Sequence, residues 1–89
     1  MNSIKGKFAL VTGGTQGLGA AIAKNFAESE AQGIVTIGRK EENGNEVAKQ
    51  IQNETGCEVI FIKTDLSDVK QCRNAVAVAL KKFGKLDIL

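Results

Sequence analysis

The segment TGGTQGLG, residues 12–19, carries four glycines in eight positions, between an apolar run and an alanine-rich run. Glycine inside a regular element costs about 0.5–1 kcal/mol relative to alanine, so a cluster of glycines marks a place where the backbone must go where no Cβ fits. The preceding residues 8–11 are continuously apolar, which is typical of a strand buried on both faces. The sequence predicts a strand, a glycine-rich turn and a helix, with a ligand or neighbour close to the backbone of the turn.

The pattern of an apolar strand followed by a helix continues along the chain. Residues 34–37 and 59–62 are predicted strands, and apolar residues at helical spacing predict helices over about 17–30, 41–55 and 69–83. Residues 86–89 start a further apolar run. Alternating strands and helices of this length pair in parallel through right-handed crossovers. We expect one domain over residues 1–89, an α/β doubly wound parallel sheet with strand order 3-2-1-4.

Apolar side chains and end signals define each predicted helix more closely. The buried stripes are expected at Leu18, Ile22 and Phe26 in the first helix, at Val47, Ala48 and Ile51 in the second, and at Val69, Cys72, Val76, Leu80 and Phe83 in the third. Glycines at 33, 56 and 84 are expected to end the three helices, and Ser67 to cap the start of the third.

Composition excludes several classes of function for this chain of 89 residues. A net charge of +2 gives no electrostatic case for binding nucleic acid or a membrane surface. The chain has no histidine and no Cys-x-x-Cys pair, so neither a zinc site nor a thioredoxin-type motif is expected. The first residues lack the apolar segment of a secretory signal, which indicates a cytosolic protein. Cys57 and Cys72 are then expected to be reduced core residues, and a disulfide between them would be unusual.

The glycine-rich turn is a predicted anion site. In doubly wound sheets ligands bind at the carboxyl ends of the strands, where the winding reverses beside the first strand. The start of a helix there offers unpaired N–H groups and a partial positive charge, which suit a dinucleotide pyrophosphate. A P-loop is excluded because no Lys-Ser or Lys-Thr follows the last glycine, and the glycine spacing is GxxxGxG rather than GxGxxG.

This spacing, preceded by Thr12, resembles the TGxxxGxG motif of the short-chain dehydrogenase/reductase family. Three further segments match that family in order: Gly38-Arg39 at the end of the second strand, Asp65-Leu66 after the third, and FGKLDIL over residues 83–89. The resemblance covers essentially the whole chain. It implies a Rossmann-type fold, an NADP or NAD cofactor, and an oxidoreductase that interconverts an alcohol and a carbonyl in a small-molecule substrate. The alternative is that the glycines serve tight packing alone.

The resemblance also implies roles for individual residues. Three glycines would permit the turn, the close approach of the cofactor and the contact between helix and strand, in the order Gly13, Gly17 and Gly19. The pyrophosphate and the adenosine ribose would be held by Gly13, Thr15, Gly17, Leu18 and Gly19. Asp65 would take the adenine amino group, and Leu66 would close on the ring through its backbone. Without the resemblance, Asp65 would be interpreted as a loop cap or a solvated carboxylate.

The end of the second strand bears on the choice between NADP and NAD. A carboxylate there would bind the ribose 2′-hydroxyl of NAD and repel a 2′-phosphate, but this chain has Gly38, followed by the cations Arg39 and Lys40. A guanidinium grips a phosphate through two parallel hydrogen bonds, so NADP is favoured. Against this, Gln16 stands where NADP-preferring relatives often carry a basic residue. Arg39 and Lys40 could also be a simple exposed charge pair.

The family's catalytic residues are missing from the sequence. Relatives use a Tyr-x-x-x-Lys pair, and this chain contains no tyrosine. We therefore name no catalytic residue and expect the chain alone to be inactive. The favoured interpretation is the N-terminal portion of a full-length oxidoreductase, and the alternative is a stand-alone dinucleotide-binding module. A third possibility is self-association through an exposed sheet edge, which would make the chain a homo-oligomer.

Overall fold

Three strands alternate with three helices in the computed structural model, which describes residues 5–12 and 17–87, with side chains described from residue 20 onward in the second range. The elements in chain order are β1 (Phe8–Thr12), α1 (Gly17–Glu28), β2 (Gly33–Gly38), α2 (Glu41–Thr55), β3 (Glu58–Lys63) and α3 (Val69–Phe83). The three strands and three helices predicted over residues 8–83 are all present. Their bounds differ from the predicted ones by at most two residues.

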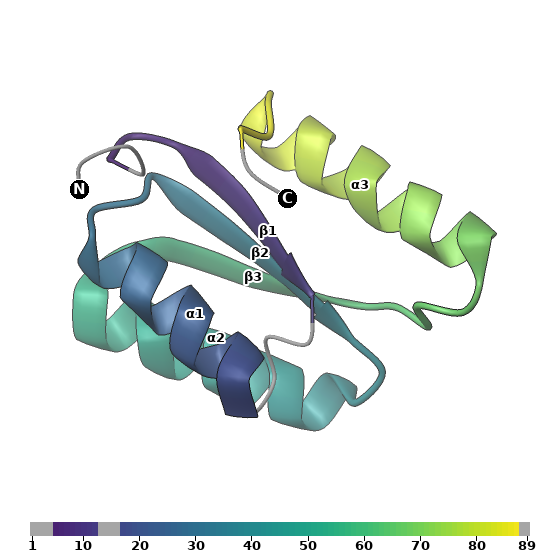
Figure 1. Cartoon of the computed structure of the whole chain (residues 1–89), viewed down its shortest axis with the longest axis horizontal. Helices are drawn as coiled ribbons and strands as arrows, with labels where there is room; N and C mark the ends of the chain where they lie inside the picture. Colours follow the sequence, from purple (N-terminus) through teal and green to yellow (C-terminus); the bar gives the residue numbers. More distant parts are fainter. Residues whose placement is uncertain (1–4, 13–16, 88–89) are drawn as a thin grey trace.

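The strands form one parallel sheet in the order β1-β2-β3, with β2 at its centre. Helices α1 and α2 lie on one face of the sheet and α3 on the other, so the molecule has three layers (Figure 1). The α/β doubly wound prediction is confirmed. Residues 86–87 are not in a strand, but the N–H of Asp87 donates to the carbonyl of Phe8 at 2.8 Å. The chain thus returns beside β1, where the fourth strand was predicted, and the last two residues of that prediction lie outside the described part.

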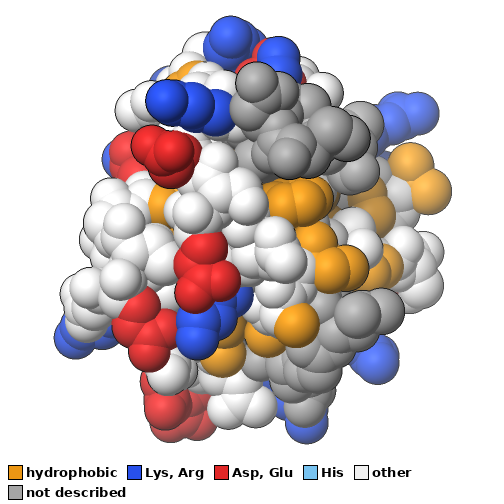
Figure 2. All heavy atoms as spheres, turned by 60° about the vertical axis from the view of Figure 1, so that its left-hand side comes forward, with side chains coloured by type: hydrophobic (Ala, Val, Ile, Leu, Met, Phe, Trp, Pro, Cys, Tyr) orange, Lys and Arg blue, Asp and Glu red, His pale blue; other side chains and the backbone are white. Residues whose placement is uncertain are grey.

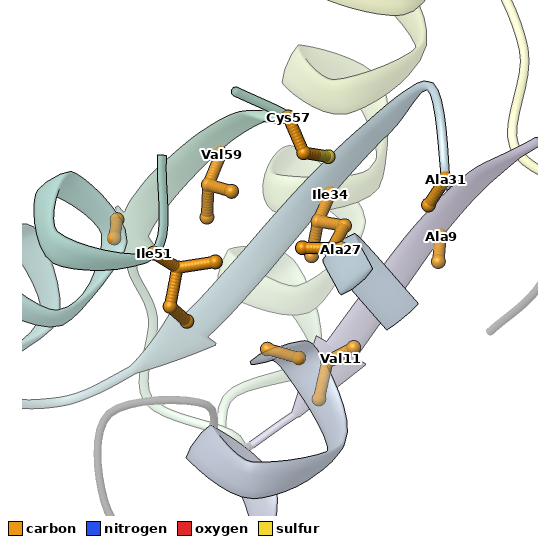
Figure 3. Packing of buried hydrophobic residues seen from close by; sticks show 10 residues of the cluster. Ala9, Val11, Ala27, Ala31, Ile34, Ile51, Cys57 and Val59 are labelled. Carbon is orange, nitrogen blue, oxygen red and sulfur yellow. The ribbon is translucent and has the colours of Figure 1, made fainter. Parts of the chain in front are cut away.

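Alternate residues of each strand feed two separate hydrophobic clusters. On the side of α1 and α2, Ala9 and Val11 of β1 and Ile34 of β2 pack with helix residues such as Ala27 and Ile51 (Figure 3). On the side of α3, the cluster comprises Leu10, Val35, Ile37, Ala75 and Ala79. All six residues of β2 are buried, Thr36 included, as expected for the central strand of a parallel sheet that is covered on both faces.

The predicted stripe of α2 is confirmed, and the stripes of α1 and α3 are right in part: Phe26, Val76 and Phe83 pack against the two clusters. Leu18 lies outside the residues whose side chains are described. Ala48 and Ile51 are buried in α2, with Val47 half-buried. In α1 the buried side chains are Ala23 and Ala27, whereas Ile22 is 37% exposed. In α3 they are Ala75 and Ala79, whereas Val69 is 63% and Leu80 42% exposed. Alanine at the contact lets a helix approach the sheet closely, and the larger aliphatic side chains then lie at the margins or in solvent.

The glycines predicted to end the helices are confirmed at two positions and wrong at one. Gly56 and Gly84 end α2 and α3 in the left-handed conformation, with φ of 78° and 86°, as predicted. Gly33 does not end α1, because it is the first residue of β2; the left-handed residue after α1 is Glu30, with φ 69°. A Cβ at Gly33 would lie 2.8 Å from the ring of Phe83 and 2.9 Å from that of Phe8. Gly33 is therefore required by the packing of the stacked Phe8 and Phe83 rings.

The two cysteines are unpaired, and they differ in their surroundings. Cys57 is buried in the cluster beneath α1 and α2, and burial raises the pKa of its thiol. Cys72 is only half-buried, so its predicted place in the core is wrong. Its Sγ lies 3.6 Å from the carbonyl oxygen of Leu66.

Over the described stretches of the chain, none of the helices has the length and apolarity that crossing a bilayer requires.

Asp87 fastens the end of the described chain to the start of β1. Its carboxylate accepts from the N–H of Phe8 at 2.9 Å, while its own N–H donates to the carbonyl of Phe8. The Phe8 N–H is the largest cause of a lowered Asp87 pKa, and the charges of Lys85 and Lys7 lower it further. A lowered pKa means that the ionised carboxylate stabilises the fold above the ordinary aspartate pKa of about 4, and that this stabilisation is lost as pH falls through the folded-state value.

We therefore expect the urea midpoint of the wild-type chain to exceed that of Asp87→Asn at pH 7. The two midpoints should converge as the pH is lowered below about 4, because the wild-type carboxyl group is then protonated and resembles the amide. The measurement is a pair of urea titrations at each pH, followed by circular dichroism. A difference between the two chains that stays constant over this range would show that the Asp87 charge contributes nothing to stability.

Candidate functional site

All three strands deliver predicted site residues to the same edge of the sheet. Because the strands are parallel, their carboxyl ends at Thr12, Gly38 and Lys63 meet at that edge. The turn after Thr12 contains Gly13, Thr15 and Gln16, which lie outside the described residues. The first turn of α1 contains Gly17, Leu18 and Gly19, in agreement with a glycine-rich turn that opens onto a helix. Their predicted contacts with a pyrophosphate stay predictions.

The end of β2 is joined directly to the segment that follows β3. The N–H of Thr64 donates to the carbonyl of Gly38 at 2.7 Å, and the Thr64 side chain is fully buried, with its hydroxyl donating to the carbonyl of Ile62. This bond brings the residues after Gly38 and after Thr64 together, so that the charge of Arg39 acts on Asp65. The structure thus brings Arg39 and Asp65 into one site. Thr64 was not among the predicted site residues. The signal that could have pointed to it is its place directly after Lys63, the last residue of β3.

Asp65 is held by Ser67 through one of its two carboxylate oxygens. Oδ1 accepts from the Ser67 hydroxyl at 2.7 Å and from the Ser67 N–H at 3.0 Å. The Ser67 hydroxyl is the largest cause of a lowered Asp65 pKa, followed by the Ser67 N–H, and the positive charge of Arg39 adds to them. Asp65 is therefore an anion at neutral pH. Its Oδ2 has no hydrogen-bond partner in the part of the chain that the structure describes. Asp65 thus acts as a loop cap with one carboxylate oxygen, as expected for it without the family resemblance, and its predicted contact with adenine stays a prediction.

The start of α3 is capped by Asp68, so the predicted Ser67 cap is wrong. Asp68 Oδ1 accepts from the N–H groups of Lys70 and Gln71, while Ser67 is turned to Asp65. Gln71, the third residue of α3, accepts the N–H of Asp65 on its Oε1 at 2.8 Å. Nothing in the sequence pattern distinguishes this glutamine from a solvated residue on a polar helix face. It was missed for that reason.

Two exposed cations follow the buried end of β2. Gly38 is buried and brings no side chain, and Arg39 and Lys40 are both exposed. Lys40 is the N-cap of α2 and makes no capping bond with its side chain, while Glu41 and Glu42 follow it in the first turn. Among the described residues, neither Arg39 nor Lys40 has a carboxylate within ion-pair distance. Both side chains are therefore free of ion pairs within the described residues. The negative charges of the two glutamates lie close by in the sequence and would repel an anion there.

Leu66 supplies an apolar surface beside these polar groups. Its side chain is 49% exposed, immediately after Asp65. The N–H of Leu66 has no hydrogen-bond acceptor within residues 5–12 and 17–87. Leu66 thus places an exposed aliphatic side chain and an unpartnered N–H next to the Asp65 carboxylate, and its predicted contact with adenine stays a prediction.

The described surface also has a hollow that these residues do not line. It has a volume of about 390 Å³ on the outer side of α1 and is lined by Ala21, Ile22, Asn25 and Phe26. Figure 2 shows one face of the molecule, with hydrophobic side chains gathered on its right half and most of the acidic side chains on its left half. The four described residues that line the hollow are uncharged.

A family model described as short chain dehydrogenase matches residues 7–89. The 2,5-dichloro-2,5-cyclohexadiene-1,4-diol dehydrogenase LinX of Sphingobium indicum is 44% identical over 88 residues, which are 99% of this chain and 34% of that protein. An uncharacterized oxidoreductase of Thermotoga maritima is 38% identical over 86 residues, 97% of this chain and 33% of that protein.

The solved structures agree with these sequence relatives. The crystal structure of L-sorbose reductase from Gluconobacter frateurii, complexed with NADPH and L-sorbose, superimposes with a TM-score of 0.92 at 30% identity. The match covers 99% of this chain and 34% of the reductase. The chain thus spans about a third of the length of the relatives that it matches. The family model matches nearly every residue, and the fold superimposes on that of the reductase over almost the whole chain. The chain therefore belongs to the short-chain dehydrogenase/reductase family.

Proposed function

We propose that this chain is the cofactor-binding portion of an oxidoreductase that interconverts an alcohol and a carbonyl, and that it binds NADP in preference to NAD. The observation that carries the preference is the end of β2, where Gly38 is buried without a side chain and Arg39 and Lys40 are exposed. No carboxylate stands at that position to repel a 2′-phosphate. L-sorbose reductase, which resembles this chain in fold, is described in complex with NADPH.

The other parts of the cofactor are assigned to the remaining residues of the same edge. The adenine is proposed to lie against Leu66, with its amino group donating to Asp65. The pyrophosphate is proposed to lie at the start of α1, held by the turn residues Gly13 and Thr15 and by the first turn of the helix, from Gly17 to Gly19, where backbone N–H groups are unpaired. Gln16 then contributes no charge to the 2′-phosphate, and Arg39 has to supply the main contact.

The chain on its own is proposed to bind cofactor without turnover. When bound, the nicotinamide supplies a hydride donor or acceptor, and the residues described above bind and orient it. The sequence contains no tyrosine, so the hydroxyl that serves as acid and base in the family has no counterpart in these 89 residues. The substrate is proposed to be a small alcohol or ketone handled by a longer protein. Location in the cytosol and assembly into a homo-oligomer stay predictions from the sequence.

The proposal is tested by calorimetric titration of the 89-residue chain with adenosine 2′,5′-bisphosphate and with 5′-AMP, which differ only in the 2′-phosphate. We expect the bisphosphate to bind about tenfold more tightly or better, because a charge-assisted hydrogen bond contributes about 1.5–3 kcal/mol. Equal affinities would overturn the preference for NADP. If neither nucleotide binds to a chain whose circular dichroism shows it folded, the cofactor-binding function is rejected.

A further inference from the structure

The loop between β3 and α3 contains two successive backbone N–H groups, and only one of them is used by the protein. The N–H of Asp65 donates to Gln71 Oε1 at 2.8 Å, whereas the N–H of Leu66 has no acceptor in the described stretches. Because Gln71 occupies the first of the two groups, the second is the one left for a ligand. The choice between them is made by a side chain of α3.

Gln71 is itself held in one orientation. Its Nε2 donates to Asp68 Oδ2 at 3.3 Å, and Asp68 Oδ1 accepts from the N–H groups of Lys70 and Gln71. With the amide nitrogen facing the Asp68 carboxylate, the amide oxygen faces the N–H of Asp65. A reversed amide would lose both bonds at once. The cap of α3 and the position of the Asp65 backbone are therefore coupled through Gln71.

We propose that Gln71 is a positioning residue for the adenine subsite, so that the loop presents one donor and one acceptor to the base. The donor is the Leu66 N–H and the acceptor is the free Oδ2 of Asp65. This inference rests on the proposed function. The adenine edge offers the complementary pair, an amino group at C6 beside an acceptor at N1. Hypoxanthine reverses the pair, with a carbonyl at C6 and a hydrogen at N1, so the same loop discriminates against inosine nucleotides.

Removing the amide oxygen of Gln71 releases the Asp65 N–H and with it the alignment of the loop. In Gln71→Met, which keeps the length of the side chain, we expect affinity for ADP to fall about fivefold, the size of one neutral hydrogen bond. Affinity for IDP should stay within about twofold, because IDP gains little from the aligned pair. The ratio of the two affinities is the informative quantity, because a variant that is merely less stable weakens both nucleotides equally.

The experiment measures ADP and IDP affinities by calorimetry for the wild-type chain and for Gln71→Met, Gln71→Glu and Gln50→Met. Gln50 is an exposed glutamine of α2, so its variant is the matched control and should keep the wild-type ratio. Gln71→Glu keeps an oxygen for the Asp65 N–H but faces Asp68 with a second charge, so it should recover part of the ratio. A wild-type ratio that Gln71→Met leaves unchanged would overturn the role of Gln71 alone. Absence of any ADP binding by the folded wild-type chain would overturn the proposed function as well.

Discussion

Gly44→Ala is expected to destabilise the fold by about 2–3 kcal/mol, although the same substitution in the middle of an ordinary helix is stabilising by about 0.5–1 kcal/mol. Gly44 is a buried residue of α2. An alanine Cβ there would lie 2.5 Å from Cγ of the Phe61 ring and closer still to two other ring atoms. Either the ring of Phe61 or the whole of α2 must move, and Phe61 packs against the cluster that α2 shares with the sheet.

The measurement is thermal and urea unfolding of the variant beside Asn45→Ala, which changes the next residue of α2. Asn45 is exposed, so its alanine variant gains helix propensity without a clash and should be neutral or slightly more stable. The double variant Gly44→Ala/Phe61→Leu should recover part of the loss, because leucine is smaller than the ring. If Gly44→Ala unfolds at or above the wild-type temperature, the close packing of α2 on Phe61 is wrong.

Arg39→Ala is expected to weaken the binding of adenosine 2′,5′-bisphosphate by about 10–100-fold, which corresponds to one charge-assisted or bidentate contact of about 1.5–3 kcal/mol. Binding of 5′-AMP should change by about twofold or less, because the 2′-phosphate is absent and the adenine site is formed by other residues. Arg39 also lies near enough to Asp65 to lower its pKa, so a small effect on 5′-AMP has a physical cause.

Two further variants make the Arg39 result specific. Arg39→Lys keeps the charge but loses the planar fork, so its affinity for the bisphosphate should lie between those of the wild type and Arg39→Ala. Arg73→Ala removes an exposed cation of α3 and controls for net charge. Should Arg73→Ala weaken the bisphosphate as much as Arg39→Ala does, the attraction would be a general effect of charge, and the assignment of Arg39 to the 2′-phosphate would fail.

The order of strands and helices could be predicted because several independent sequence signals mark each element. Residues 8–11 are apolar without interruption, residues 34–37 are all β-branched, and glycines follow α2 and α3 at the positions where those helices end. The stripes of α1 and α3 could not be predicted with the same accuracy, because these helices carry two adjacent apolar rows. Periodicity selects the larger side chains, whereas the close approach of helix to sheet selects the alanines.

Some residues of the candidate site could likewise be predicted from the sequence, and others could not. Arg39 was predicted from its place after the second strand and Asp65 from the family resemblance, and the structure places them near enough for the charge of Arg39 to act on Asp65. Ser67 and Asp68 are both good helix caps one residue apart, so only the structure shows that Asp68 caps α3 and Ser67 holds Asp65. The bond from Asp65 to Gln71 joins a backbone group to a side chain six residues away and leaves no periodic trace in the sequence.

Leu66 has a thermodynamic consequence for whatever binds beside it. Its aliphatic side chain is about half exposed, so it orders water in the free protein that a stacked ring would release. Release of water from apolar surface lowers the heat capacity of the system. The enthalpy of nucleotide binding at this edge should therefore become more favourable as the temperature rises, even where the affinity itself hardly moves.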